Sequence, residues 1–318
     1  MGSSILTQIE EIYYPLLALL GIPANLVTIV ILSRGKCGLS KCITIYLVAM
    51  AAADLLVLIV DVLLYEMNEI YFPESFLDYT PVCSLNFFLI FASIECSVWL
   101  TVAFTFDRFI AICCQKIRTH YCTERTAAVV VATMWGLSIL ENIPISFTFE
   151  PRIIIDDVLW FCNVKSSLYT VPIWVAFLWV DIALMPFIPF LLILIFNGLT
   201  IRHILLTNRI RRGLRSSSSD PEMENRRKSI VLLLAISGSF ILLWMVTFTH
   251  YICVQILDIQ YLHTDYSHPF TIMEQTGYML QHLSSCTNTI IYAVSQTKFR
   301  LQLKNLFKYP LVLIKFGK

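Results

Sequence analysis

Charged side chains are scarce in this sequence of 318 residues. Asp, Glu, Lys and Arg make up only 14% of it, whereas 57% of the residues belong to the apolar set, and the mean hydropathy is +0.73. A soluble domain has about 25% charged residues. The shortage of charge excludes an ordinary cytosolic enzyme, and the high hydropathy excludes disorder. A net charge of +1 gives no basis for nucleic-acid binding, so lipid is the expected solvent for most of the chain.

Several functional signatures are also missing. The sequence has no Asn-x-Ser/Thr sequon, and no basic segment precedes the first apolar run, so neither N-glycosylation nor a cleavable signal peptide is expected. It has no nucleophile–base pair, phosphate loop or HExxH motif, which argues against an enzyme. It shows neither the internal repeats nor the paired broken helices of transporters. A transporter or channel is therefore not expected.

Seven apolar runs are long enough to cross a membrane, because a spanning helix needs about 20 mostly apolar residues. None alternates apolar and polar residues as a membrane barrel would, so the expected fold is an all-α bundle of seven helices. We expect residues 1–11 to form an extracellular N-terminus, 12–294 the bundle, and 295–318 an amphipathic helix with a short cytoplasmic tail. The runs are 12–33, 42–65, 83–112, 126–147, 173–201, 229–256 and 268–294.

The basic residues fix the orientation of the bundle. Of the 23 Lys and Arg residues, 21 fall in the loops after spans one, three and five or in the tail, and only Arg152 and Lys165 lie on the other side. Lys and Arg concentrate on the cytoplasmic side of membrane proteins. The N-terminus is therefore expected outside and the C-terminus inside. In the tail, residues 297–308 place apolar side chains at helical spacing against Lys and Arg, which predicts a helix lying on the membrane surface in contact with lipid.

The ten cysteines divide by compartment. Five fall at the reducing cytoplasmic face and three lie within spans, which leaves Cys83 and Cys162 as the evident extracellular pair. A bridge between them would hold the loop after span four across the outer mouth of the bundle. The alternative is two free thiols.

A set of motifs in fixed order resembles the rhodopsin-like class of G protein-coupled receptors. The class arrangement includes Cys83 followed 25 residues later by the Arg of an Asp-Arg motif. The resemblance covers nearly the whole chain. The motifs are Asn25 in GIPANLV, Asp54 in LVAMAAADLL, Asp107-Arg108-Phe109, Trp135, Pro189 with Asn197, Trp244 after FILL, and NTIIY from Asn288 to Tyr292.

This resemblance implies a plasma-membrane receptor that binds an extracellular ligand and activates a heterotrimeric G protein. Spans one to three most resemble the group of the orphan G protein-coupled receptor 139, which implies aromatic amino acid or peptide ligands and the Gq type. The sequence departs from the family pattern at three positions, which carry Phe109, Val246 and Thr289. In the family, the last two positions normally carry prolines that act as hinges. A decoy that does not signal, an olfactory-like chemosensory receptor and a proton-sensing receptor therefore stay open as alternatives.

The resemblance also assigns switch residues. Arg108 would be held by Asp107 at rest, or by Glu224, and would face the G protein when the receptor is active. The residues implied in coupling are Asp107, Arg108, Phe109, Phe240, Trp244, Asn288 and Tyr292.

Asp54 is implied in an allosteric sodium site with Ser97, Ser284 and Asn288, since oxygen ligands suit a hard cation. The alternative is a protonated Asp54 bonded to Asn25. No other cofactor is expected.

Acidic residues in the outer half of the bundle suggest the ligand's charge. Four acids lie there: Asp61, Glu95, Glu141 and Asp181. The outer half of the spans contains no Lys or Arg to pair with them, so His250 and His282 are the basic candidates. Acids facing lipid are costly, so most should point inward. They could be neutralised by protons, a charged histidine or a ligand cation, or each could be satisfied separately. We expect a cationic or aromatic ligand at a site formed by Ile90, Phe91, Ile94, Glu95, Glu141, Asp181, Trp244, Tyr251 and His282.

Arrestin recruitment is predicted to be weak. Residues 298–318 contain no Ser or Thr, so phosphorylation cannot add negative charge there, and Ser216–Ser219 form the remaining cytoplasmic cluster. Replacing these four serines by Ala should remove agonist-driven arrestin recruitment in a cell-based proximity assay. Recruitment that persists at the level of the unmodified receptor would contradict this prediction.

Overall fold

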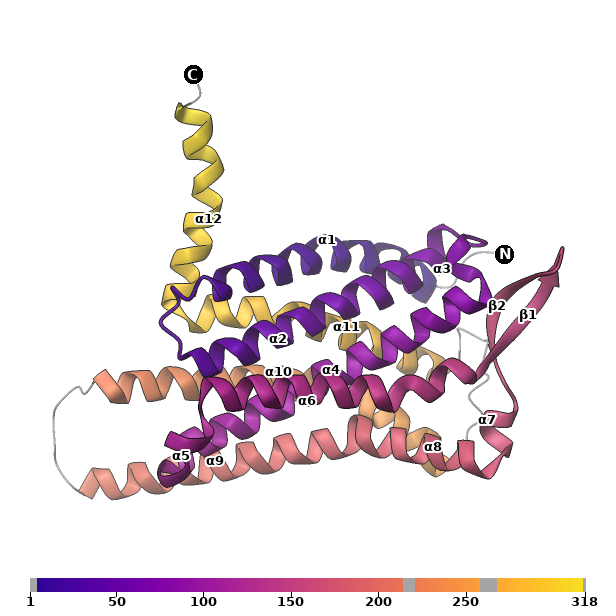
Figure 1. Ribbon diagram of the computed structural model, residues 1–318. Coiled ribbons are helices and arrows are strands. Elements are labelled where there is room, and N and C mark those ends of the chain that lie inside the picture. The colour runs from indigo at the N-terminus through magenta and orange to yellow at the C-terminus, as the bar shows by residue number, and fades with distance from the viewer. Residues whose placement is uncertain (1–4, 214–220, 258–267, 317–318) are drawn as a thin grey trace.

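The computed structural model describes residues 5–213, 221–257 and 268–316 as a bundle of long helices lying side by side (Figure 1). The cluster Ser216–Ser219 lies outside the described residues. The long helices are α1 (Ile5–Ser33), α2 (Lys41–Val57), α4 (Thr80–Cys113), α6 (Glu124–Asn142), α8 (Pro172–Ile182), α9 (Ile188–Gly213), α10 (Pro221–Leu257), α11 (Pro269–Ser295) and α12 (Thr297–Phe316). Shorter elements are η1 (Leu58–Glu66), α3 (Met67–Tyr71), η2 (Phe76–Asp78), α5 (Gln115–Tyr121), η3 (Ile143–Phe147), α7 (Ser167–Thr170) and η4 (Ala183–Phe187).

Six helical stretches in the described part are long and apolar enough to cross a membrane, by length and composition. They correspond to the first six expected spans. The expected seventh span is α11, which carries more polar residues, among them Gln281 and His282, both buried. A helix that buries polar groups must find partners for them on its neighbours. In α11 these partners lie on α1, α2 and η1, as the hydrogen bonds below show.

The described residues form three apolar cores, two of which pack against α4. The inner core contains Tyr46, Phe104 and Tyr292. The outer core contains Ile94 and Trp244. A third, smaller core packs α1 against η1 around Tyr14 and Leu58.

Both ends of the chain are more helical than the sequence predicted. Helix α1 begins at Ile5, so residues 5–11, expected outside the bundle, form its first turns. Glu is a good helix former, and the Tyr71 hydroxyl donates to the carbonyl of Glu11, which ties this start to α3. Helix α12 continues to Phe316 instead of ending near residue 308. It runs across the long direction of the bundle (Figure 1), with Phe299 buried against the inner core.

Two spans are interrupted where the sequence predicted continuous helices. The second span changes into a π-helix, η1, between α2 and α3. The fifth is broken in η4, where Met185 has non-helical φ and ψ of −146° and 108° directly before Pro186. Proline removes a backbone donor and clashes with the preceding turn. Short π segments occur often at functional sites.

The bundle is mostly helical, as expected, and a β-hairpin is added at its outer end (Figure 1). Strand β1 (Phe149–Ile155) pairs antiparallel with β2 (Val158–Val164). Asp156 and Asp157 both have positive φ, 49° and 60°, as a two-residue hairpin turn of the primed type requires. Trp160 packs edge-on against Tyr79 at a centroid distance of 4.4 Å, so the hairpin lies against the start of α4.

The expected disulfide is confirmed. Cys83 of α4 is bonded to Cys162 of β2, 79 residues later. The Thr80 hydroxyl also donates to the carbonyl of Phe161 at 2.8 Å. The hairpin is thus held to α4 by a covalent bond and a hydrogen bond.

Removing this bridge is expected to destabilise the outer mouth. A loop of 79 residues corresponds to about 4 kcal/mol of loop-closure entropy in the unfolded chain. Cys83→Ser should abolish surface expression or ligand response, as measured by flow cytometry of an N-terminal tag and by a signalling assay. Cys253→Ser, a free cysteine of α10, is the control. Normal trafficking and signalling of Cys83→Ser would refute the role given to the bridge.

Candidate functional site

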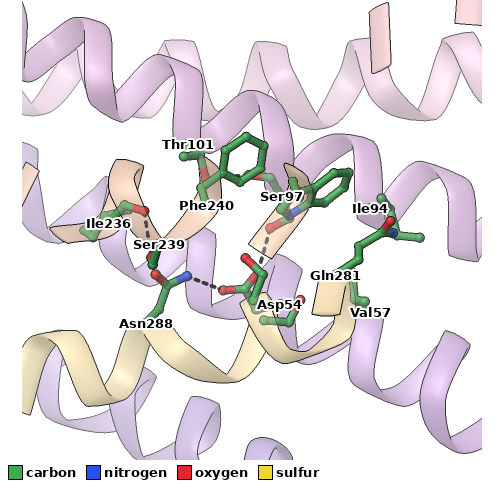
Figure 2. Close-up of a pocket in the computed structure, with 13 residues that line it drawn as sticks. Asp54, Val57, Ile94, Ser97, Thr101, Ile236, Ser239, Phe240, Gln281 and Asn288 are labelled. Atoms are coloured by element: carbon green, nitrogen blue, oxygen red, sulfur yellow. Dashed lines mark hydrogen bonds between the residues drawn. The ribbon is translucent and has the colours of Figure 1, made fainter. Parts of the chain in front are cut away.

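A buried polar pocket lies where α2, α4, α10 and α11 meet (Figure 2). The Ser97 hydroxyl of α4 donates to Oδ1 of Asp54 at 2.6 Å, and the Asn288 amide of α11 donates to Oδ2 at 2.7 Å. Asp54 is 1% exposed. This carboxylate therefore joins three helices through two short hydrogen bonds.

The pocket has room for one small particle. Its volume of about 20 Å³ matches a water molecule or a small ion. The oxygen-bearing side chains on its wall are Asp54, Ser97, Thr101, Ser239, Gln281, Ser284, Ser285 and Asn288. Oxygen donors of this kind suit a hard monovalent cation, so the four residues assigned to sodium line one cavity.

The alternative interpretation required a bond between Asn25 and Asp54, but the hydrogen bonds of Asn25 go elsewhere. Its amide donates to the carbonyl of Ser285 at 2.8 Å and to that of Gly21 at 3.1 Å. Asn25 thus holds α1 to α11 beside the pocket. Asp54 accepts hydrogen bonds from Ser97 of α4 and Asn288 of α11 instead.

Two aromatic side chains form the wall of the pocket on α10. Phe240 and Trp244 are stacked with ring centroids 5.1 Å apart, and both line the pocket together with Ile94. A movement of Trp244 would therefore change the shape of the Asp54 pocket directly. Val246 follows where a proline is usual, and α10 is one helix from Pro221 to Leu257.

The cytoplasmic end holds a buried ion pair. Nε of Arg108 donates to Asp107 at 2.9 Å and a second guanidinium nitrogen also contacts this carboxylate. Arg108 reaches Ser229 of α10 at 3.4 Å, a weak hydrogen bond. Asp107 also accepts from the Cys42 thiol at 3.3 Å. The side chain of Glu224, the other expected partner of Arg108, lies outside the described residues.

This ion pair borders a cavity of about 550 Å³. Arg108, Arg118, Lys228 and Lys298 all line it, so its wall carries positive charge. Such a wall favours a partner segment that ends in carboxylates.

The other two cytoplasmic candidates are packed among aromatic rings. Phe109 stacks on Phe196 of α9 at 5.6 Å. Tyr292 is 1% exposed and contacts Phe299 of α12 edge-on at 5.8 Å. Its hydroxyl has no hydrogen-bond partner among the described residues. Both rings therefore connect α4 or α11 to a neighbouring helix at the cytoplasmic half.

The structure brings three of the four outer acids together. The carboxylate of Glu95 on α4 interacts with those of Glu141 on α6 and Asp181 on α8. Glu95 is buried, and the amide of Asn142 donates to it at 2.5 Å. The cluster therefore has one amide partner and three carboxyl groups.

The fourth outer acid belongs to a different place in the bundle. Asp61 of η1 is paired with His282 of α11, with 2.6 Å between Oδ2 and Nε2. Both side chains are buried. His282 thus faces η1 and α1, and the structure separates it from the Glu95 cluster with which the sequence grouped it.

The apolar residues expected in the ligand site also lie in separate places. Ile90, Ile94 and Trp244 belong to one buried cluster. Phe91 lies next to Phe87, 6.5 Å away, and Phe87 stacks on Phe149 of the hairpin. Tyr251 lies beside His250 on α10.

Sequence reasoning missed four polar partners. Asn142 follows Glu141 directly, and a polar pair inside an apolar run was the available signal. Cys42 and Ser285 gave none, because a cysteine or serine in a membrane helix is unremarkable by itself. Glu66 of η1 interacts electrostatically with His282 and Asp61, and it was overlooked because it falls at the end of a span.

Comparison with known proteins identifies the family. Residues 24–292 match the family model described as 7 transmembrane receptor (rhodopsin family). The chain is 21% identical to galanin receptor 2a of Danio rerio, over 94% of this chain and 78% of the receptor. It is 22% identical to C-C chemokine receptor type 1 of Macaca fascicularis (96% and 81%) and 24% identical to C5a anaphylatoxin chemotactic receptor 1 of Oncorhynchus mykiss (94% and 81%). The chain therefore belongs to the rhodopsin family of seven-transmembrane receptors.

Proposed function

We propose that this receptor resides in the plasma membrane, binds an extracellular ligand and activates a heterotrimeric G protein through the cavity beside Arg108. The observation that carries the proposal is the buried Asp107–Arg108 pair at the wall of a large, positively lined cytoplasmic cavity. Arg108 is 5% exposed, and a buried Arg is stabilised by its partner. A partner that enters the cavity can offer carboxylates or carbonyls in place of Asp107. Release of Arg108 toward the partner is then the coupling step.

We further propose that the extracellular ligand is a peptide. The relatives are named as receptors for galanin, chemokines and the C5a anaphylatoxin. The cluster of Glu95, Glu141 and Asp181 favours a positively charged group on that ligand. Membership of the G protein-coupled receptor 139 group and coupling to the Gq type remain proposals from the resemblance.

The Asp54 pocket is proposed as an allosteric sodium site. A single carboxylate with hydroxyl and amide oxygens around a cavity for one small particle supports this use. When bound, the ion would neutralise Asp54 and hold α2, α4 and α11 together. Ser97, Ser284 and Asn288 are its proposed partners.

The competing interpretation is a decoy that does not signal. It is favoured by α10, which contains no proline between its first residue and Leu257, and by Asn288-Thr289 in place of Asn-Pro. The experiment on Arg108 below separates it from the proposed function.

The first test measures ligand-free G protein activation in transfected cells. The receptor should activate a G protein above mock-transfected cells, and Arg108→Ala should lose that activity, because Arg108 is the cavity-lining cation that is paired with Asp107. Arg34→Ala, an exposed arginine at the same end, is the matched control and should keep it. A wild-type receptor that activates no G protein family at equal surface expression would favour the decoy.

The sodium site is tested by thermal unfolding of the purified receptor. A bound ion stabilises the folded state in proportion to RT ln(1 + [Na⁺]/Kd), which is about 2.7 kcal/mol at a hundredfold excess over Kd. Sodium chloride should raise the unfolding midpoint more than choline chloride at equal ionic strength. Asp54→Asn should remove the difference and Glu95→Gln should not. Equal midpoints in the two salts for the wild type would refute the site.

The acidic cluster is tested with neutral isosteres. Glu95→Gln, Glu141→Gln and Asp181→Asn keep the shape of each side chain and remove its charge. Assayed for signalling between about pH 6 and 8, where histidines titrate, at least one variant should lose the response to cationic peptides or change the response to pH. If all three respond like the wild type to every active ligand and to pH, the acidic-pocket proposal fails.

A further inference from the structure

Three hydroxyl groups line the cytoplasmic cavity beside Arg108, those of Ser40, Ser229 and Thr297. The Ser40 hydroxyl is the N-cap of α2 and accepts from the backbone N–H of Ile43. The Ser229 hydroxyl accepts instead from Nη1 of Arg108, at 3.4 Å, which is long for a hydrogen bond. Ser229 is therefore the hydroxyl that faces Arg108, and it leaves this donor weakly bonded.

The two sides of the Arg108 guanidinium have different partners. Nε and Nη2 both donate to Oδ2 of Asp107, whereas Nη1 donates to Ser229 of α10. A guanidinium has five N–H donors in a fixed fork, so the Nη1 side can bind an acceptor on α10 while the other side keeps Asp107. A stronger acceptor at Ser229 would therefore tie α4 to α10 without breaking the Asp107–Arg108 pair.

The cavity wall around Ser229 is built to receive an anion. Arg118, Lys228 and Lys298 line it together with Arg108, and the lining residues include no Asp or Glu. Cations from α4, α5, α10 and α12 therefore converge on one cavity of about 550 Å³. Phosphate is an anion that such groups bind well, because Arg forms paired hydrogen bonds with it and Lys acts as a point charge.

The sequence around Ser229 is that of a kinase substrate. Arg226, Arg227 and Lys228 precede it, and the apolar Ile230 follows. Kinases select substrates by charge pattern, and an acidic substrate groove recognises arginines two and three residues before the acceptor hydroxyl. The described contacts of α10 with the inner core begin at Ile230, and α10 starts beyond the cytoplasmic end of α2 (Figure 1). Helix ends open at the lowest free-energy cost, so a kinase can take up this segment in extended form.

The other two hydroxyls of the cavity lack this pattern. The residues three and two positions before Ser40 are Cys37 and Gly38, and those before Thr297 are Val294 and Ser295. Neither hydroxyl therefore follows a basic pair. Ser229 combines the basic sequence with a direct contact to Arg108.

We propose that Ser229 is a phosphorylation site for a basophilic serine/threonine kinase, and that the phosphate binds Arg108 and Lys298 in the cavity and closes it to the G protein. The second half of this inference rests on the function proposed above. The kinase transfers the γ-phosphoryl group of ATP. The bond from this group to the β-phosphate oxygen breaks, an ester bond to Oγ of Ser229 forms, and ADP and the hydroxyl proton leave.

The phosphate acts on coupling in two ways. It adds a charge of about −1.5 to −2 and three acceptor oxygens, which extend further into the cavity than the hydroxyl and take the Nη1 donors of Arg108 in charge-assisted hydrogen bonds. This contact holds the cytoplasmic ends of α4 and α10 together. The added negative charge also neutralises the wall and repels the carboxylates of an entering partner. Phosphorylation of Ser229 therefore switches coupling off directly, without a need for arrestin.

The first experiment measures phosphate incorporation into the full-length receptor in lipid nanodiscs, with ATP and the catalytic subunit of cAMP-dependent protein kinase. Ser216–Ser219 follow Arg215 and can be modified by the same kinase, so these four serines are Ala in every sample. Mass spectrometry of proteolytic peptides should locate a phosphate at Ser229. A receptor that acquires no phosphate at Ser229 overturns the proposal.

Matched variants test the recognition of Ser229. Ser229→Ala should lose this phosphate. Arg227→Gln should slow its incorporation at least about tenfold, because it removes a charge-assisted hydrogen bond to the kinase. Arg34→Gln, which changes an exposed arginine outside the motif, should not slow it. Equal rates for Arg227→Gln and Arg34→Gln would refute recognition through the basic sequence.

The second experiment measures nucleotide exchange on the heterotrimeric G protein that the receptor activates in cells. Each receptor is compared with itself after incubation with the kinase and a non-hydrolysable ATP analogue. Phosphorylation should lower the exchange rate at least about tenfold, and a phosphatase should restore it. Ser229→Ala should show no difference between its two samples. An unchanged exchange rate in a receptor fully phosphorylated at Ser229 overturns the closure of the cavity.

The position of the phosphate is measured by ³¹P NMR without any G protein. The phosphoserine signal should differ from that of a phosphorylated peptide of residues 222–232, and Arg108→Gln and Lys298→Gln should each move it toward the peptide signal. Lys298→Gln leaves the Asp107–Arg108 pair intact and keeps the test valid where Arg108→Gln does not fold. A signal that coincides with that of the peptide, or that neither variant moves, would place the phosphate outside the cavity and refute the proposal.

These readouts separate the two proposals. A receptor whose phosphate lies in the cavity, but which activates no G protein in its unmodified form, contradicts the proposed function alone. A receptor that activates its G protein equally with and without the phosphate contradicts this inference alone.

Discussion

A carboxyl group inside a membrane bundle must find its partner within the protein, because lipid offers no hydrogen bonds and no countercharge. Of the five buried acids in the described part of the chain, four are hydrogen-bonded to other described residues, whereas Oε1 of the fifth, Glu10, has no partner among them. Asp54 is bonded to α4 and α11, Asp61 to α11, Glu95 to α6, and Asp107 to its neighbour Arg108 and to Cys42 of α2. A hydrogen bond to a charged group contributes about 1.5–3 kcal/mol. Apolar packing between membrane helices tolerates sliding, so these polar contacts set the register of the bundle.

The same contacts determine how the bundle can move. Without the usual prolines, α10 is continuous and α11 is held at Asn288 by Asp54. A Cβ on Gly277 of α11 would come within 2.9 Å of the Thr247 hydroxyl and 3.2 Å of its backbone, so the two helices touch backbone to backbone in their outer halves. Such close packing through a small residue resists separation. An outward movement of the cytoplasmic half of α10 must therefore carry α11 with it or break the bond between Asn288 and Asp54.

The sequence predicted the long helices and the disulfide, because both leave strong local signals: apolar length, and two cysteines in one compartment. The hairpin was not predicted although Asp156-Asp157 lies between Ile-Ile-Ile and Val-Leu-Trp, because its two strands lie outside the long apolar runs that predict the bundle. The π-helix η1 left no signal, since its apolar residues suit either helix type. Asp61 lies against His282 on α11, on the same side as Asp54 seven residues earlier, because seven residues make about two helical turns.

The acidic cluster of α4, α6 and α8 limits what a ligand cation can gain in the outer half. The Asn142 amide already donates to Glu95 at 2.5 Å, so an incoming ammonium competes with an existing hydrogen bond. The gain from a cation at this cluster must therefore come mainly from relieving the repulsion among Glu95, Glu141 and Asp181.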